Sequence, residues 1–194
     1  MKTTVKITTA LTFLFACSMH ANAQSTPQPP ASPNGVIYSI GAEGGIVTND
    51  FKDTHKVFYG GSIQADIPVA SQLYATINAG YSEFIGKDNI DGTGIKAKDL
   101  HFLPVMAGLK FFPVPLLYIQ ADAGAGFALD KSNQGFDKTA VFIYTPQIGL
   151  QIPFSGKSYL DAGIRYEATT KFVSGQDNSK IDFIGLRLAY GFSL

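Results

Sequence analysis

Histidines are the first residues to examine for catalysis, because imidazole is the side chain that most readily takes up or gives a proton near neutral pH. The chain has three of them. His20 lies in an N-terminal leader, and His55 lies in a polar stretch where we expect a solvated surface position. His101 follows Asp99 by two residues and could pair with it on one face of a strand, but the sequence marks no serine or cysteine nucleophile beside it. The histidines therefore predict no catalytic triad.

An oxygen-rich loop at residues 87–94, KDNIDGTG, is the strongest candidate for a metal site. A calcium loop of the EF-hand type needs Asp-x-Asp-x-Asp-Gly spacing, and Lys87 stands where the first acidic ligand should be. No other cluster of metal ligands is present, and no glycine-rich phosphate loop follows a strand and opens a helix. We expect a flexible surface loop here and no cofactor.

The elements that position the remaining polar residues are predicted by a period of two. The stretch 118–130 reads YIQADAGAGFALD, with Ile119 and Phe127 on one parity and Gln120 and Asp122 on the other. Such alternation is typical of a strand with one apolar and one polar face. The same pattern recurs along the chain, and it predicts strands at about 36–48, 56–68, 72–85, 100–112, 116–129, 139–152, 158–171 and 181–194.

The connections between these strands alternate in length. Those at 69–71, 113–115 and 153–157 are tight, whereas those around 49–55, 86–99, 130–138 and 172–180 are longer and polar. Outer-membrane barrels show this asymmetry, with short turns on the periplasmic side and long loops outside. The pattern favours an all-β fold, an eight-stranded antiparallel up-and-down transmembrane β-barrel whose four longer loops lie outside the cell.

The composition of the two faces decides which one meets lipid. One face holds large aliphatic and aromatic side chains with almost no charge, whereas the other is rich in glycine and small polar residues. An eight-stranded interior is too narrow for so many large side chains, so we expect the apolar face outside and the small residues inside. Alternation alone does not exclude a soluble exported barrel with the apolar face inside, which would bind a ligand.

Charged residues of both signs fall on the inward parity. Inside a barrel they must pair and hydrogen-bond to offset the cost of desolvation. We therefore interpret them as a structural charge network that plugs the lumen, and its members are Glu43, Asp66, Lys110, Asp122, Asp161, Arg165, Glu167 and Arg187.

Aromatic side chains of the apolar face are predicted to form two girdles at the membrane interfaces. Running the strands alternately up and down places Tyr59, Tyr81, Phe127, Phe142, Tyr144 and Tyr166 toward the long-loop end, and Tyr38, Phe111 and Phe192 toward the short-turn end.

The N-terminus has the organisation of an export signal. Lys2 and Lys6 precede an apolar run, and a small-x-small cleavage site ends at Ala23, so we expect a signal peptide at 1–23, a flexible lead-in at 24–34 and the barrel at 35–194. Lipidation at Cys17 is the alternative. The formal charge is zero, and loss of the two lysines leaves 13 basic against 15 acidic residues. That balance argues against nucleic acid as a partner.

The last residues, 187–194 (RLAYGFSL), resemble the β-signal of bacterial outer-membrane proteins, with Tyr190, Phe192 and Leu194 at its apolar positions. With the glycine-rich strand cores at 121–127 and 161–166, the chain resembles the small eight-stranded outer-membrane β-barrel family, the outer membrane protein beta-barrel domain. The resemblance implies a location in the bacterial outer membrane, with lipid and the barrel-assembly machinery as partners. It implies an architecture rather than an activity.

Several roles are compatible with that architecture. Some small barrels of this superfamily modify lipid A, but the His-x-Ser pair of the deacylase type is absent here, so we expect no enzyme. We expect a structural or surface-interaction role, with a possible ligand bound by the long loops. The alternative is a narrow channel or carrier for small molecules, suggested by Phe102, Pro104 and Met106 on the inward parity.

Deletion of residues 192–194 should block assembly into the membrane, because it removes the end of the predicted β-signal. Cell fractionation of the truncated and full-length proteins checks this. Truncated protein recovered in the outer membrane at the full-length yield would contradict the assignment.

Overall fold

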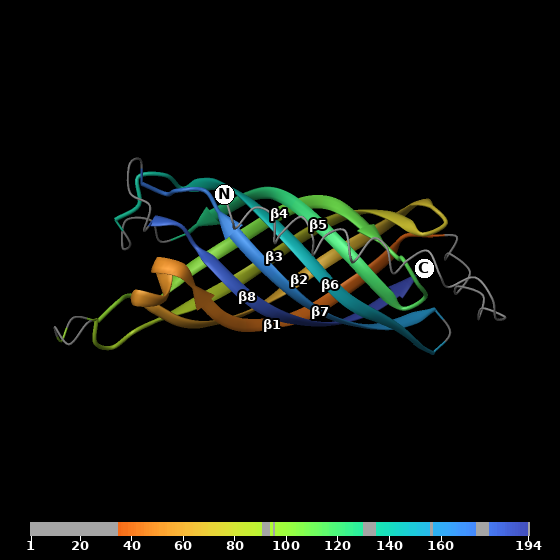
Figure 1. Cartoon of the computed structure of the whole chain (residues 1–194), viewed down its shortest axis with the longest axis horizontal. Coiled ribbons are helices and arrows are strands. Elements are labelled where there is room, and N and C mark those ends of the chain that lie inside the picture. Colours follow the sequence, from red (N-terminus) through yellow and green to blue (C-terminus); the bar gives the residue numbers. More distant parts are fainter. Residues whose placement is uncertain are drawn as a thin grey trace, which may run out of the picture.

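The computed structural model describes residues 35–90, 94, 96–129, 135–155, 157–173 and 179–193, so the predicted signal peptide and lead-in lie outside it. The chain forms one closed antiparallel barrel with strands in sequential order, as Figure 1 shows. The strands are β1 (Ile37–Thr48), β2 (His55–Ala70), β3 (Leu73–Gly86), β4 (Leu100–Phe111), β5 (Leu117–Ala128), β6 (Ala140–Ser155), β7 (Ser158–Thr169) and β8 (Asp182–Ser193).

The barrel closes where its first and last strands pair. The register of β1 on β8 runs from Ile37 opposite Ser193 to Thr48 opposite Asp182. Closure leaves no strand edge with unpaired backbone groups, which is the condition for a sheet to stand in hydrocarbon. The short turns and the end of β8 lie at the right in Figure 1, and a short 3-10 helix, η2 (Asn49–Asp53), lies at the opposite end. Among the described residues, no helix has the length and apolar composition needed to cross a membrane.

The two faces of each strand are separated as the alternation predicts. In β5, Ile119 is 48% exposed, whereas Tyr118 and Gln120 are buried. The same holds around the barrel, where Ile40, Ile63 and other large apolar side chains of the outer face are exposed. The apolar face therefore lies outside and the glycine-rich face lines the lumen. The prediction of orientation is confirmed, and the soluble barrel with an apolar interior is wrong.

Lumen glycines make room for inward-pointing rings. A Cβ atom added to Gly126 would lie 2.1 Å from Cζ of Phe102, and one added to Gly163 would lie 2.6 Å from the hydroxyl of Tyr118. Real Cβ atoms do not approach other atoms so closely, so these positions exclude any larger residue unless the ring moves. At these two positions the absence of a side chain leaves room for a large ring from another strand.

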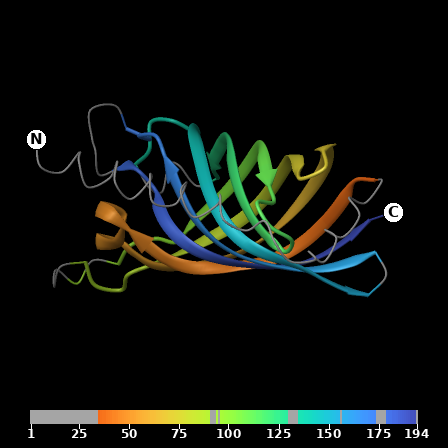
Figure 2. The same ribbon diagram turned by 45° about the vertical axis from the view of Figure 1, so that its right-hand side comes forward.

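The first long connection differs from the prediction of a polar surface loop. It contains η2, whose Phe51 is buried, and His55 begins β2 with 1% of its surface exposed. The expected solvated position of His55 is therefore wrong. The helix η2 lies at the long-loop end of the barrel (Figure 2), and the burial of Phe51 shows that a stretch that reads as polar in sequence contributes an apolar ring to the interior.

Aromatic rings gather on the outer face near the short turns. Ring centroids are 6.1 Å apart for Tyr38 and Phe192, 6.2 Å for Tyr190 and Phe192, and 6.2 Å for Phe154 and Tyr190. Phe154 is 67% exposed, and Phe111 of the predicted girdle is also exposed. Amphipathic and aromatic rings favour the interface between hydrocarbon and water, so this arrangement suits one boundary of a membrane.

Substitution of Ala123 by Arg tests the outward orientation. Ala123 is exposed on the outer face of β5, so a charge there should destabilise the fold by about 2–4 kcal/mol near the bilayer midplane. Urea unfolding in lipid vesicles measures the effect, and Ala123→Leu is the matched control that should be tolerated. An equal stability of both variants would place this face away from lipid.

Candidate functional site

The inward-facing charges occupy the middle and short-turn half of the lumen. All eight predicted members are buried, with exposures of 7% or less. They come from β1, β2, β4, β5, β7 and β8, so residues far apart in sequence meet across the barrel. We call this set the lumen network, and its members are Glu43, Asp66, Lys110, Asp122, Asp161, Arg165, Glu167 and Arg187.

Glu43 is held between two arginines. One of its oxygens pairs with Nη2 of Arg165, and the other lies 3.5 Å from Nε of Arg187. The hydroxyl of Ser62 donates to the same carboxylate at 2.5 Å and accepts from Nε of Arg187 at 3.1 Å. Because guanidinium groups bind carboxylates through several directed donors, this arrangement fixes the positions of both arginines.

Lys110 is the centre of a second group nearer the short turns. Its ammonium lies 2.7 Å from Asp66 and 3.4 Å from Asp161. Nη1 of Arg187 lies 3.3 Å from Asp161, which joins this group to the first one. The Tyr118 hydroxyl donates to Asp161 at 2.8 Å, and its ring lies 4.4 Å from the Lys110 ammonium in a cation–π contact.

Neutral donors stabilise the carboxylates that exceed the number of cations. The network holds five carboxylates against three cations. Asp122 accepts hydrogen bonds of 2.6 Å from both Thr76 and Gln120. Glu167 accepts from Thr145 at 3.2 Å and lies 3.6 Å from Arg165. The sequence predicted ion pairing for the whole set, and the geometry adds hydroxyl and amide partners that a list of charges does not reveal.

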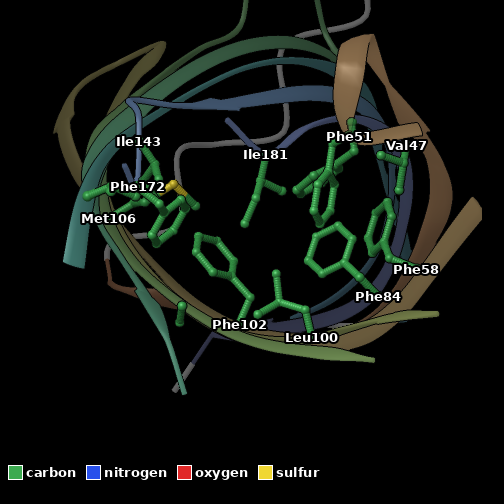
Figure 3. Packing of buried hydrophobic residues seen from close by; sticks show 13 residues of the cluster. Val47, Phe51, Phe58, Phe84, Leu100, Phe102, Met106, Ile143, Phe172 and Ile181 are labelled. Carbon is green, nitrogen blue, oxygen red and sulfur yellow. The ribbon is translucent and has the colours of Figure 1, made fainter. Parts of the chain in front are cut away.

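The long-loop half of the lumen is filled by apolar side chains, which Figure 3 shows pointing into the ring of strands. Phe84 is fully buried, with ring centroids 5.4 Å from those of Phe58 and Phe183. We call the set the apolar cluster, and it consists of Val47, Phe51, Phe58, Phe84, Leu100, Phe102, Met106, Ala128, Val141, Ile143, Phe172, Ile181 and Phe183.

Residues of the first long connection complete this cluster at the long-loop end of the barrel. Phe51 of η2 stacks on His55 with centroids 4.2 Å apart and meets Phe84 edge-on at 5.7 Å. His55 is held by the hydroxyl of Thr54 at 2.9 Å and the carbonyl of Lys98 at 3.2 Å. The mouth at this end is thus packed by side chains of the barrel and of its connections.

Sequence reasoning missed most of the apolar cluster, although a signal was present. Phe58, Phe84 and Phe183 share the parity of the glycines rather than that of the outer face. A phenylalanine between small residues on the inward parity indicates a ring that crosses the lumen. Phe102 and Met106, which were placed inward from the sequence, are confirmed as buried.

Among the residues that the structure describes, the other candidates for chemistry do not assemble into a site. His101 lies 4.0 Å from Glu83 and stacks on Tyr81, whereas the carboxylate of Asp99 accepts from the amide of Gly86. Within the described part of the chain, no three His, Cys, Asp or Glu side chains are placed to hold a metal ion.

An exposed ion pair joins Asp88, in the candidate metal loop, to Lys96 beyond it, and residues 91–93 of that loop lie outside the described residues. Nζ of Lys96 lies 2.8 Å from the Asp88 carboxylate, and both side chains are largely exposed. Their hydrogen bond, and then their charges, lower the pKa of Asp88 and raise the pKa of Lys96. Such exposed pairs contribute little to folding stability.

The residues of the predicted assembly signal lie on the last strand. Tyr190 and Phe192 are on the outer face of β8, and the Tyr190 hydroxyl lies 2.7 Å from that of Ser158. Leu194 lies outside the described residues. Two apolar positions of the signal therefore face outward, on the strand that closes the barrel.

A family model described as the outer membrane protein beta-barrel domain matches residues 9–192. The chain belongs to this family. The match covers β1 to β7 and all but the last residue of β8, and it agrees with the resemblance expected from the sequence. The chain is therefore an integral β-barrel of the bacterial outer membrane.

Solved structures share the fold at low sequence identity. Ail of Yersinia pestis in a phospholipid bilayer nanodisc is similar with a TM-score of 0.54 and 18% identity, over 81% of this chain and 99% of that one. OprG of Pseudomonas aeruginosa is similar with a TM-score of 0.51 and 12% identity, over 82% of this chain and 96% of that one. No curated protein matches the chain. At these identities the likeness shows the fold alone.

Arg165→Ala should destabilise the barrel by about 3–5 kcal/mol, because it leaves Glu43 buried beside only one arginine. Urea unfolding in detergent micelles measures the loss. Glu43→Gln in the same chain should recover part of it, since the amide has no charge to leave uncompensated. Lys96→Ala is the control for an exposed ion pair and should leave the unfolding midpoint unchanged. An unchanged midpoint for Arg165→Ala would remove the structural role of the network.

Proposed function

We propose that this protein is a non-enzymatic barrel with a sealed lumen, which stabilises the outer membrane and presents its long loops to the outside. The observation that supports the proposal is the filling of the lumen by two successive layers, the lumen network and the apolar cluster. An eight-stranded barrel is narrow enough for side chains to fill it.

Each layer opposes passage for a different reason. An ion entering the apolar cluster would lose its hydration without gaining polar partners, which is costly. A solute entering the lumen network would have to break ion pairs that are themselves buried, such as that of Lys110 with Asp66. The two layers in series therefore make a barrier to both polar and apolar solutes.

The loops supply the surface through which such a barrel would act. Loop 87–99 displays the exposed Asp88–Lys96 pair, and the start of η2 places Asp50 at the same end of the barrel. Loops carried by a rigid scaffold are a common location for recognition sites. The partners we propose are outer-membrane lipid, the barrel-assembly machinery during biogenesis, and a surface ligand bound by the long loops.

A narrow carrier for small apolar molecules is the second candidate function. The apolar cluster in the long-loop half of the lumen favours this role. Rings such as those of Phe102 and Phe172 could separate to admit an apolar molecule. Transport through the barrel would also require the lumen network, on the short-turn side of the cluster, to rearrange. Uptake of apolar solutes into vesicles with and without the protein distinguishes this role from a sealed barrel.

Planar bilayers that contain the purified protein should show no stepwise ionic conductance, because both layers close the lumen. A known open porin recorded under the same conditions is the positive control. Discrete, ohmic conductance steps would contradict the sealed lumen and favour a channel.

A further inference from the structure

The mouth at the short-turn end contains a small groove that neither layer fills. It has a volume of about 50 Å³ and lies between the β2–β3 and β4–β5 turns and the start of β1. Three aromatic rings line it, those of Tyr74, Phe112 and Tyr159, together with the amide side chains of Gln72 and Gln151. It is thus an apolar groove with hydrogen-bonding groups at its margin.

The rings of the groove are fixed by their neighbours. Phe112 meets Tyr74 edge-on with centroids 5.6 Å apart and lies 5.9 Å from Tyr118. Tyr118 is fully buried and bonded to the lumen network, and Gln151 lies 3.4 Å from the ammonium of Lys110. The floor of the groove is therefore the lower surface of the network. A ligand here would add a third layer to the lumen.

Aromatic grooves with nearby amide groups are suited to proline-rich segments. Such segments adopt polyproline II helices, which expose backbone carbonyls and flat proline rings. Rings of this kind pack against aromatic side chains, and little conformational entropy is lost because the helix is already formed.

The chain has a proline-rich segment adjacent to the groove. Residues 24–34 read QSTPQPPASPN, and Ile37, three residues further on, itself lines the groove. An extended chain spans at most about 3.6 Å per residue, so Pro33 can lie no more than about 14 Å from Ile37. Pro30 is also within reach of the mouth. The tether therefore keeps several prolines within reach of the aromatic rings.

We propose that the proline-rich residues 24–34 dock in this groove. The tether favours this occupant over a separate partner, since a short linker gives an effective concentration of about a millimolar. A site too weak to hold a free peptide would still be occupied. The groove is then a binding site for the chain's own lead-in, and its ligand chemistry is a polyproline II helix.

Disulfide trapping tests the docking. In a chain with Cys17→Ala, a cysteine replacing Ala31 is paired with one replacing Gln72, at the edge of the groove. The matched control pairs Ala31→Cys with Lys157→Cys. Lys157 lies outside the groove at the same end, and its carbonyl accepts from Ser193, which pairs with Ile37. Both partners are thus within reach of an undocked tether.

Docking predicts that the pair at positions 31 and 72 forms its disulfide about tenfold faster than the control pair. Replacement of Pro29, Pro30 and Pro33 by Ala should remove that preference without changing the length of the tether. Equal rates for the two pairs, or a preference that survives loss of the prolines, would overturn the proposal. Neither result bears on whether the lumen above is sealed.

A fluorescence measurement gives a second readout. The chain has no tryptophan, so Phe112→Trp introduces a single reporter in the groove. Deletion of residues 24–34 should shift its emission to longer wavelength and increase quenching by acrylamide. Emission and quenching that are unchanged by the deletion would overturn the docking of residues 24–34.

Discussion

The pairing of β1 with β8 is the constraint on which the other features of this molecule depend. Hydrocarbon offers no partners for peptide groups, so a sheet can cross it only if every strand has two neighbours. The continuous register from Ile37 opposite Ser193 to Thr48 opposite Asp182 meets that condition. Once the barrel is closed, each strand residue faces either lipid or a narrow lumen. The polarity and size of its side chain follow from which of the two it faces.

In the sealed barrel that we propose, two kinds of side chain fill the narrow lumen. Toward the long loops, phenylalanine rings cross the interior into spaces left by glycines such as Gly126. Toward the short turns, charges of both signs meet across the barrel, and neutral donors such as Thr76 stabilise the surplus carboxylates. The buried charges are tolerated because nearly every one has several partners. Removing one partner leaves a buried charge uncompensated. It should therefore lower the stability more than replacing both partners of the pair by apolar side chains would.

The sequence predicts the strands and their faces well, because a period of two is a local property. It places Glu43 and Arg165 on the inward side for the same reason. It does not reveal that they contact each other, since partners across a barrel depend on the stagger of strands distant in sequence. Likewise β6 continues to Ser155 rather than ending near Ile152, since its pairing with β7 extends the strand.

The loops mark the other limit of prediction from sequence. Phe51 and His55 stand in a polar stretch, yet both are buried because the connection folds over an apolar surface that only the closed barrel creates. Tertiary packing determines their positions, and no local pattern encodes it. Phe172 and Ile181, at either end of the last long connection, are buried for the same reason.

Cysteine accessibility measures most directly whether the lumen is filled. Ser82 faces inward on β3 with 2% of its surface exposed, and Ser82→Cys changes its size very little. In a chain with Cys17→Ala, a water-soluble thiol reagent should modify this cysteine far more slowly than one replacing the exposed Lys157, because side chains exclude solvent from the lumen. Similar rates of modification at the two positions would contradict the central claim that the barrel is sealed.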